Sequence, residues 1–107
     1  MFELIARAWK ARCPKRHEEG FIKYLYETGI KDTSATKGFQ GAQIFQRTVK
    51  DESEITLITY WDNMESIKDY AGEDIGVAVL YPEDVKYELN PDYHVNHYEV
   101  IENTWLC

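Results

Sequence analysis

Residues 55–67 constrain the fold of this chain more than any other stretch, because they combine a strand with the start of a helix. Their sequence is ITLITYWDNMESI, and its first seven residues are mostly β-branched or aromatic, which favours a strand. Asp62 is followed three positions later by Glu65, the spacing of a capping box that opens a helix. So short a junction between strand and helix is typical of a compact α+β domain.

The rest of the chain predicts further strands and one further helix. Residues 2–12 alternate loosely as a first strand, residues 38–49 form a second, and residues 93–101 form the last. After the first strand, apolar side chains recur at helical spacing as far as Gly29, which can end the helix in a left-handed conformation. Residues 50–53 are a hairpin turn. The β-α-β-β-α-β order predicts an α+β, ferredoxin-like fold, with an antiparallel sheet and both helices on one face.

The segments between these elements carry weaker patterns. Residues 31–37 are polar and predict a link, residues 73–80 are apolar enough for one more turn, and residues 85–89 form a short strand between two proline turns. The acidic pair Glu83-Asp84 is expected to lie at a helix start or in a turn and to face solvent. Because the chain has no linker, repeat or low-complexity tract, residues 1–107 are expected to form a single domain.

The predicted central strand is apolar on both faces. Alternation along the strand places two sets of side chains on opposite sides: Ile55, Leu57, Thr59 and Trp61 on one, and Thr56, Ile58 and Tyr60 on the other. Helices can cover only one of these faces, so the other needs protein or ligand over it. A second copy of the chain is the simplest cover, which predicts a homodimer.

Composition and charge exclude several classes of function. A net charge of −7 repels nucleic acid, whose binding depends on Lys and Arg. No apolar run is long enough for a membrane span and the N-terminus does not resemble a signal peptide, so the protein is expected in the cytoplasm. Cys13 and Cys107 offer neither metal spacing nor a disulfide framework, so reduced thiols and no metal site are expected. Three Trp, eight Tyr and four Phe favour an aromatic-lined cavity or interface, and hence a small aromatic ligand.

Five short motifs, taken in order, resemble a known family. They are Ile5-Ala6-Arg7-Ala8-Trp9, Lys37-Gly38-Phe39-Gln40-Gly41, Tyr60-Trp61-Asp62 with Glu65-Ser66-Ile67, Tyr81-Pro82-Glu83-Asp84, and His97-Tyr98-Glu99-Val100. Together they resemble the antibiotic biosynthesis monooxygenase-like proteins, which have the dimeric α+β barrel fold. The resemblance implies a homodimer whose two sheets form one barrel, with a cavity between sheet and helices in each subunit. Activities known in the family include cofactor-free oxygenation of phenolic polycyclic compounds to quinones, and oxidative haem breakdown.

Haem breakdown conflicts with the sequence. The haem-degrading branch has a tryptophan nine residues after the strand-end tryptophan and a haem-ligating histidine ten residues further on. In this chain those positions are Tyr70 and Leu80, counted from Trp61. Leucine cannot ligate iron and haem needs an axial ligand, so haem degradation is rejected and no cofactor is expected.

Cofactor-free oxygenation asks less of the protein: a base, donors for the resulting oxyanion, and a dry pocket. His94 and His97 are three residues apart in a predicted strand, so they point to opposite faces and only one can reach the cavity. The resemblance favours His97 as the catalytic residue. The competing interpretation is that a strand histidine packs in the core or at an interface, which is the commoner role.

The same resemblance suggests the walls of a substrate site. Arg7 is a possible anion donor, and the candidate walls are Trp9, Trp61, Tyr70, Tyr81 and Tyr98. Trp61 is also a natural core residue between strand and helix. The resulting hypothesis is a cofactor-independent monooxygenase acting on a small aromatic or polycyclic compound. The alternative is a non-catalytic homodimer that binds a small hydrophobic ligand or has a regulatory role, which the lack of a complete acid–base or metal set favours.

Overall fold

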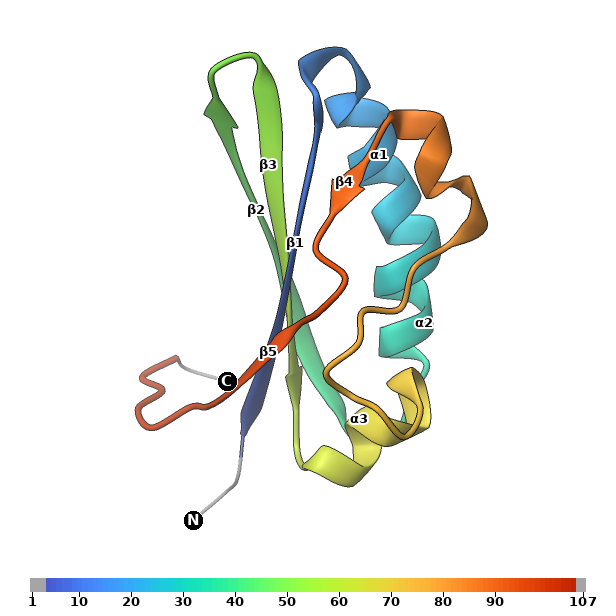
Figure 1. The fold of residues 1–107 in the computed structure, drawn as a ribbon. Coiled ribbons are helices and arrows are strands. Elements are labelled where there is room, and N and C mark those ends of the chain that lie inside the picture. Colours follow the sequence, from blue (N-terminus) through green and yellow to red (C-terminus); the bar gives the residue numbers. More distant parts are fainter. Residues whose placement is uncertain (1–3, 106–107) are drawn as a thin grey trace.

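The computed structural model describes residues 4–105, in which an antiparallel sheet carries all of its helices on one side (Figure 1). The sheet order is β2-β3-β1-β4, and β5 also pairs with β1. The strands are β1 (Ile5–Pro14), β2 (Phe39–Val49), β3 (Glu52–Trp61), β4 (Asn90–Pro91) and β5 (Asn96–Glu99). The helices are α1 (Glu18–Leu25), α2 (Lys31–Ser34) and α3 (Met64–Ala71), with 3₁₀ segments η1 (Lys15–His17) and η3 (Pro82–Tyr87) and a π segment η2 (Tyr26–Ile30). This arrangement confirms the predicted ferredoxin-like α+β fold.

Strand register decides which side chains face the helices. β1 pairs with β3 from Ile5 opposite Trp61 to Pro14 opposite Glu52. On its other edge β1 pairs with β5, where Arg7 lies opposite His97. Side chains of paired residues share a face, so Arg7 and His97 both point to the helical side. The open face of the sheet carries the intervening residues of these strands.

The core between sheet and helices has two parts. In the first, Phe21 and Leu25 of α1 pack on Ile55 and Leu57 of β3. The second is built around Trp61, which is completely buried with Ile5 and Ile67, the latter from α3. Residues bordering both parts surround the cavity described below.

The first helix does not end at Gly29, as the sequence suggested. It runs on through η2 and α2 to Ser34, so the predicted polar link begins only after that residue. Gly29 is buried, and a Cβ atom there would lie 3.3 Å from Cδ2 of Leu57, so glycine allows the helix to approach the sheet closely. The glycine that takes a positive φ after this helix is Gly38, where φ is 96°.

Helix α3 begins one residue later than its capping-box pattern predicted. Asn63 is the N-cap, and its Oδ1 accepts a hydrogen bond from the backbone N–H of Ser66 at 2.9 Å. Asp62 accepts from the hydroxyl of Ser66 at 3.0 Å, whereas Glu65 only lies near Lys68 on the helix surface. The prediction of Asp62 and Glu65 as a capping box was therefore wrong.

The chain between α3 and β5 differs most from expectation. Residues 73–80 form a single hydrogen-bonded turn, closed from the N–H of Val77 to the carbonyl of Asp74, and no helix. Residues 82–87 form the 3₁₀ segment η3 where a strand over 85–89 was predicted. The last strand covers only residues 96–99. This segment is held by contacts with residues distant in sequence, described below. Such contacts cannot be predicted from the local sequence pattern. The predicted start of the first strand at Phe2, and Cys107, lie outside the described residues.

No helix among residues 4–105 is long and apolar enough to cross a membrane.

Candidate functional site

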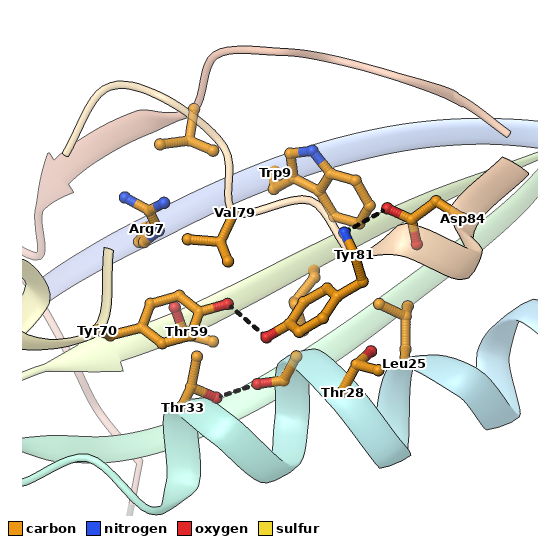
Figure 2. A pocket seen from close by; sticks show the side chains of 13 residues that line it. Arg7, Trp9, Leu25, Thr28, Thr33, Thr59, Tyr70, Val79, Tyr81 and Asp84 are labelled. Carbon is orange, nitrogen blue, oxygen red and sulfur yellow. Dashed lines mark hydrogen bonds between the residues drawn. The ribbon is translucent and has the colours of Figure 1, made fainter. Parts of the chain in front are cut away.

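A cavity lies between the sheet and the helices (Figure 2). Its walls come from β1, β3, the first helix, α3 and the segment that follows α3: Arg7, Trp9, Leu25, Thr28, Gly29, Thr33, Leu57, Thr59, Tyr70, Val79, Tyr81, Asp84 and Val95. The space open to the centres of water molecules is about 30 Å³. That is room for one or two waters, whereas ligand pockets usually measure roughly 300–1,000 Å³. A larger ligand requires the cavity to open.

Arg7 is the main charged group of the cavity wall. Only 5% of the residue is exposed. Its guanidinium donates to the backbone carbonyls of Ile75 at 2.5 Å and Val77 at 3.3 Å, and it lies 5.9 Å from the ring centre of Tyr70. Burial lowers the pKa of Arg7, yet an arginine side chain stays charged. Among residues 4–105 no carboxylate pairs with it.

His97 stands behind Arg7 and does not line the cavity. Its Nε2 lies 3.1 Å from Nη1 of Arg7, and because a guanidinium can only donate, the imidazole accepts this hydrogen bond. The ring is therefore neutral, with its proton on Nδ1. Burial, and then the charge of Arg7, lower the pKa of His97. His94 is exposed, and its backbone bridges to Val77.

Two tyrosine hydroxyls meet in the cavity. Tyr70 projects from α3 and Tyr81 immediately precedes η3, and their Oη atoms are 3.4 Å apart, pointing toward each other in Figure 2. Tyr81 Oη also donates to Oδ2 of Asp32 at 2.7 Å. Burial raises the pKa of both phenols, and for Tyr81 the hydrogen bonds with Tyr70 and Asp32 raise it further. Both side chains are therefore neutral.

Asp84 also faces the cavity, although the sequence suggested that it faces solvent. Its Oδ2 accepts a hydrogen bond from the backbone N–H of Tyr81 at 3.0 Å, which fixes the start of η3. Burial raises the pKa of this carboxyl group. The prediction of a helix-start residue was right, but the predicted solvent-facing position was wrong.

The remaining candidate residues divide between cavity, core and surface. Trp9 lines the cavity and donates from Nε1 to the carbonyl of Asp92 at 2.9 Å. Trp61 lies in the core, where its Nε1 donates to Oγ1 of Thr59 at 2.8 Å. Tyr98 lies opposite Ala6 on the open face of the sheet and is 56% exposed. The structure thus brings Arg7, Trp9, Tyr70 and Tyr81 together and places Trp61 and Tyr98 elsewhere.

Sequence reasoning missed two carboxylates, Asp32 beside Tyr81 and Asp84 on the wall. Asp32 was assigned to a polar link, and the contact with Tyr81 joins residues 49 positions apart. The sequence could have indicated the position of Asp32 only if the first helix had been predicted to continue past Gly29. Among residues 4–105, no three His, Cys, Asp or Glu side chains cluster as a metal site requires.

Together these features define a ferredoxin-like α+β protein with an aromatic-walled cavity and a buried arginine side chain, Arg7. No protein-family model matches the sequence, and no curated protein sequence matches it. Solved structures do match in fold. A Bacillus cereus protein provisionally assigned as an antibiotic biosynthesis monooxygenase has a TM-score of 0.67 and 12% identity, over 97% of this chain and 99% of that one. SnoaB, a cofactor-independent oxygenase from Streptomyces nogalater, has a TM-score of 0.61 and 8% identity, over 95% and 97%.

Two further solved structures show which other kinds of protein have a similar fold. The haem-degrading protein Rv3592 from Mycobacterium tuberculosis has a TM-score of 0.59 and 15% identity, over 98% of this chain and 99% of that one. A protein described as dimeric and ferredoxin-like, from an uncultured marine organism, has a TM-score of 0.63 and 10% identity, over 95% and 99%. Identities this low establish a shared fold, and a fold accommodates many functions.

Proposed function

We propose that this protein is a cofactor-independent monooxygenase that takes a small aromatic phenol or enol into the cavity, where the substrate reacts as its anion. The observation that carries this proposal is the buried Arg7 guanidinium on the cavity wall, which has only neutral partners. A buried charge is costly unless it is paired, so a phenolate or enolate oxygen beside Arg7 would complete the site. The fold shared with a cofactor-independent oxygenase supports the assignment.

The chemistry is balanced without a further reactant. An ionised substrate such as anthrone donates electrons to O₂, one oxygen atom becomes the new carbonyl of the quinone, and the other leaves as water. Arg7 stabilises the anion that must form first, which is the electrostatic contribution expected of a preorganised cationic group. The apolar and aromatic wall, with Trp9 and Leu57, keeps that anion away from bulk water.

Substrate entry requires the segment over the cavity, residues 72–80, to move outward, while Tyr81 stays held by its hydrogen bonds with Asp32 and Asp84. This segment has little regular structure, and Arg7 holds it through the carbonyls of Ile75 and Val77. The oxygen of the bound substrate would compete with those two carbonyls for the guanidinium. Binding of the substrate and release of the segment are therefore coupled through one side chain.

Oxygen uptake with anthrone tests the proposal. We expect O₂ consumption and anthraquinone in equal amounts with the native protein, and a loss of roughly 100-fold or more in kcat/KM for Arg7→Met. The control is Arg16→Met, which removes an exposed charge paired with Glu88 and should leave the rate unchanged. An uptake rate that does not increase with protein concentration would exclude the oxygenase.

The second candidate is non-catalytic binding of a small hydrophobic anion, in a carrier or regulatory role. It is favoured by the position of His97, whose Nε2 is engaged by Arg7 and so cannot accept a substrate proton directly. A thermal shift with aromatic carboxylates or phenols that is abolished by Arg7→Met, in the absence of oxygen uptake, would support this candidate over the first.

We further propose that the protein is a homodimer joined through the open face of the sheet. That face exposes Phe45 and Tyr98, which are 50% and 56% exposed, around Ile58 and Tyr60. Lys10, Arg47 and Glu54 line a groove beside them, so both signs of charge are present for pairing between copies. The dimeric description of one protein of similar fold supports this assignment.

A further inference from the structure

We propose that Tyr70, Tyr81 and Asp32 form a proton path from the cavity to solvent, along which the bound substrate loses its hydroxyl proton. The inference rests on the proposed oxygenase function, because it identifies how the substrate anion of that reaction forms. The three residues come from separate segments: α3, the residue before η3, and α2. Their contacts are 3.4 Å between the two hydroxyls and 2.7 Å from Tyr81 to the carboxylate.

Hydrogen-bonding capacity gives the path a direction. An ionised carboxylate can only accept, so the proton of the Tyr81 hydroxyl points to Asp32. The oxygen of Tyr81 is then an acceptor for the hydroxyl of Tyr70. The lone pairs of Tyr70 are left to accept a hydrogen bond from a substrate in the cavity. Every donor in the chain therefore points outward, from the cavity to Asp32.

The transfer conserves protons at each step. The O–H bond of the phenol, or of the enol tautomer in the case of anthrone, breaks as a new O–H bond forms on Tyr70, whose original proton passes to Tyr81. The original proton of Tyr81 passes in turn to Asp32. Both tyrosines end neutral, and Asp32, which is exposed, releases its proton to water. The net change is one proton lost by the substrate and one gained by solvent, while the anion remains near Arg7.

Other groups near the path are less suited to this role. Arg7, from β1, faces Tyr70 and favours the anion but cannot accept a proton. Asp84, from η3, lies on the cavity wall, and one of its oxygens is held by the backbone of Tyr81. His97 accepts from Arg7. Asp32 alone among these groups combines an acceptor position in the tyrosine chain with direct exposure to water.

The test compares anthrone oxidation by the native protein, Asp32→Asn and Tyr81→Phe across the pH range. We expect both variants to lose roughly 100-fold in kcat, with KM little changed, because the path acts on proton removal and not on binding. In Asp32→Asn the lost rate should return in part as pH rises or when formate is added, since either supplies an acceptor at the surface. Formate should not rescue Tyr81→Phe, whose chain is interrupted inside the protein.

The matched control is Glu27→Gln, which removes an exposed carboxylate from the preceding turn of the same helix and should leave kcat unchanged. Native kcat and pH dependence in Asp32→Asn would overturn the path while leaving the oxygenase intact. If kcat fell in Asp84→Asn but not in Asp32→Asn or Tyr81→Phe, the proton path would be overturned and Asp84 on the cavity wall would be the base. Absence of turnover in the native protein would instead overturn the oxygenase proposal and the path with it. Because Asp32 is at the surface, its variant keeps the test decisive even if Tyr81→Phe fails to fold.

Discussion

Arg7 is a charged side chain that the fold buries almost completely. It contacts the cavity, holds the carbonyls of Ile75 and Val77, and donates to His97. Each of these partners is neutral, so the hydrogen bonds compensate only part of the cost of burying a cation. The proposed function uses the remaining cost, because an anionic substrate beside Arg7 would offset it. His97 contributes by staying uncharged beside the guanidinium.

The protonation of His97 should make stability depend on pH. Its pKa is lowered in the folded protein, so below about pH 6.5 the unfolded chain binds more protons and acid favours unfolding. Above that pH the imidazole is neutral in both states and its contribution is fully present. We expect the melting temperature of the native protein to fall by a few °C more than that of His97→Gln between about pH 7.5 and 5.5. Glutamine keeps an acceptor for Arg7 but cannot be protonated.

Thermal melts of His94→Gln provide the control, since that histidine is exposed. It should follow the native protein over the same range. If His97→Gln loses stability in acid as steeply as the native protein, the depressed pKa of His97 does not contribute to the pH dependence.

Strands and helices were predictable from sequence to different degrees. The central strands β1 to β3 follow from alternation and β-branched content, because a half-buried strand records its faces in its own sequence. The first helix was predicted too short, because Gly29 serves close packing on Leu57 and not a left-handed end. Residues 73–95 were predicted worst. Their path depends on contacts with Arg7 and on the Val77–His94 bridge, which involve residues distant in sequence.

The N-cap of α3 gives the sharpest test of an element boundary. Asn63 satisfies a backbone N–H that the helix itself cannot, so Asn63→Ala should lower the free energy of unfolding by about 1 kcal/mol. For a domain of this size that corresponds to a drop of roughly 4–8 °C in Tm. Glu65→Gln, at the position that the capping-box pattern favoured, should change the free energy of unfolding by less than about 0.5 kcal/mol. If urea denaturation showed the same loss in the free energy of unfolding for both variants, the N-terminal cap would instead be formed by Asp62 and Glu65.

The overall architecture was predictable because the order of elements allows few arrangements. The candidate site was predictable only in part. Arg7, Trp9, Tyr70 and Tyr81 were identified by residue type and family resemblance, and all four line the cavity. Asp32 and Asp84 were not, because their roles depend on where Tyr81 lies after the chain has crossed the helices. Residue type predicts the chemistry available, whereas partners far apart in sequence require the fold.

The open face of the sheet should decide the oligomeric state. Ile58 lies in the middle of that face, between Ala8 on β1 and Gln43 on β2, so it would be at the centre of a sheet-to-sheet interface. We expect the native protein to sediment at twice the 12.6 kDa chain mass at micromolar concentration. Ile58→Asp should sediment as a monomer, because an unpaired charge at the centre of an apolar interface is strongly unfavourable.

Val85→Asp is the matched control, because it places the same charge on η3, where Val85 is 81% exposed on the helical side. That variant should remain dimeric. Because the cavity is formed within one chain, monomeric Ile58→Asp should still show the thermal shift given by an anionic aromatic ligand. A native protein that is monomeric at micromolar concentration would exclude the dimer, and a dimeric Ile58→Asp would move the interface to another surface.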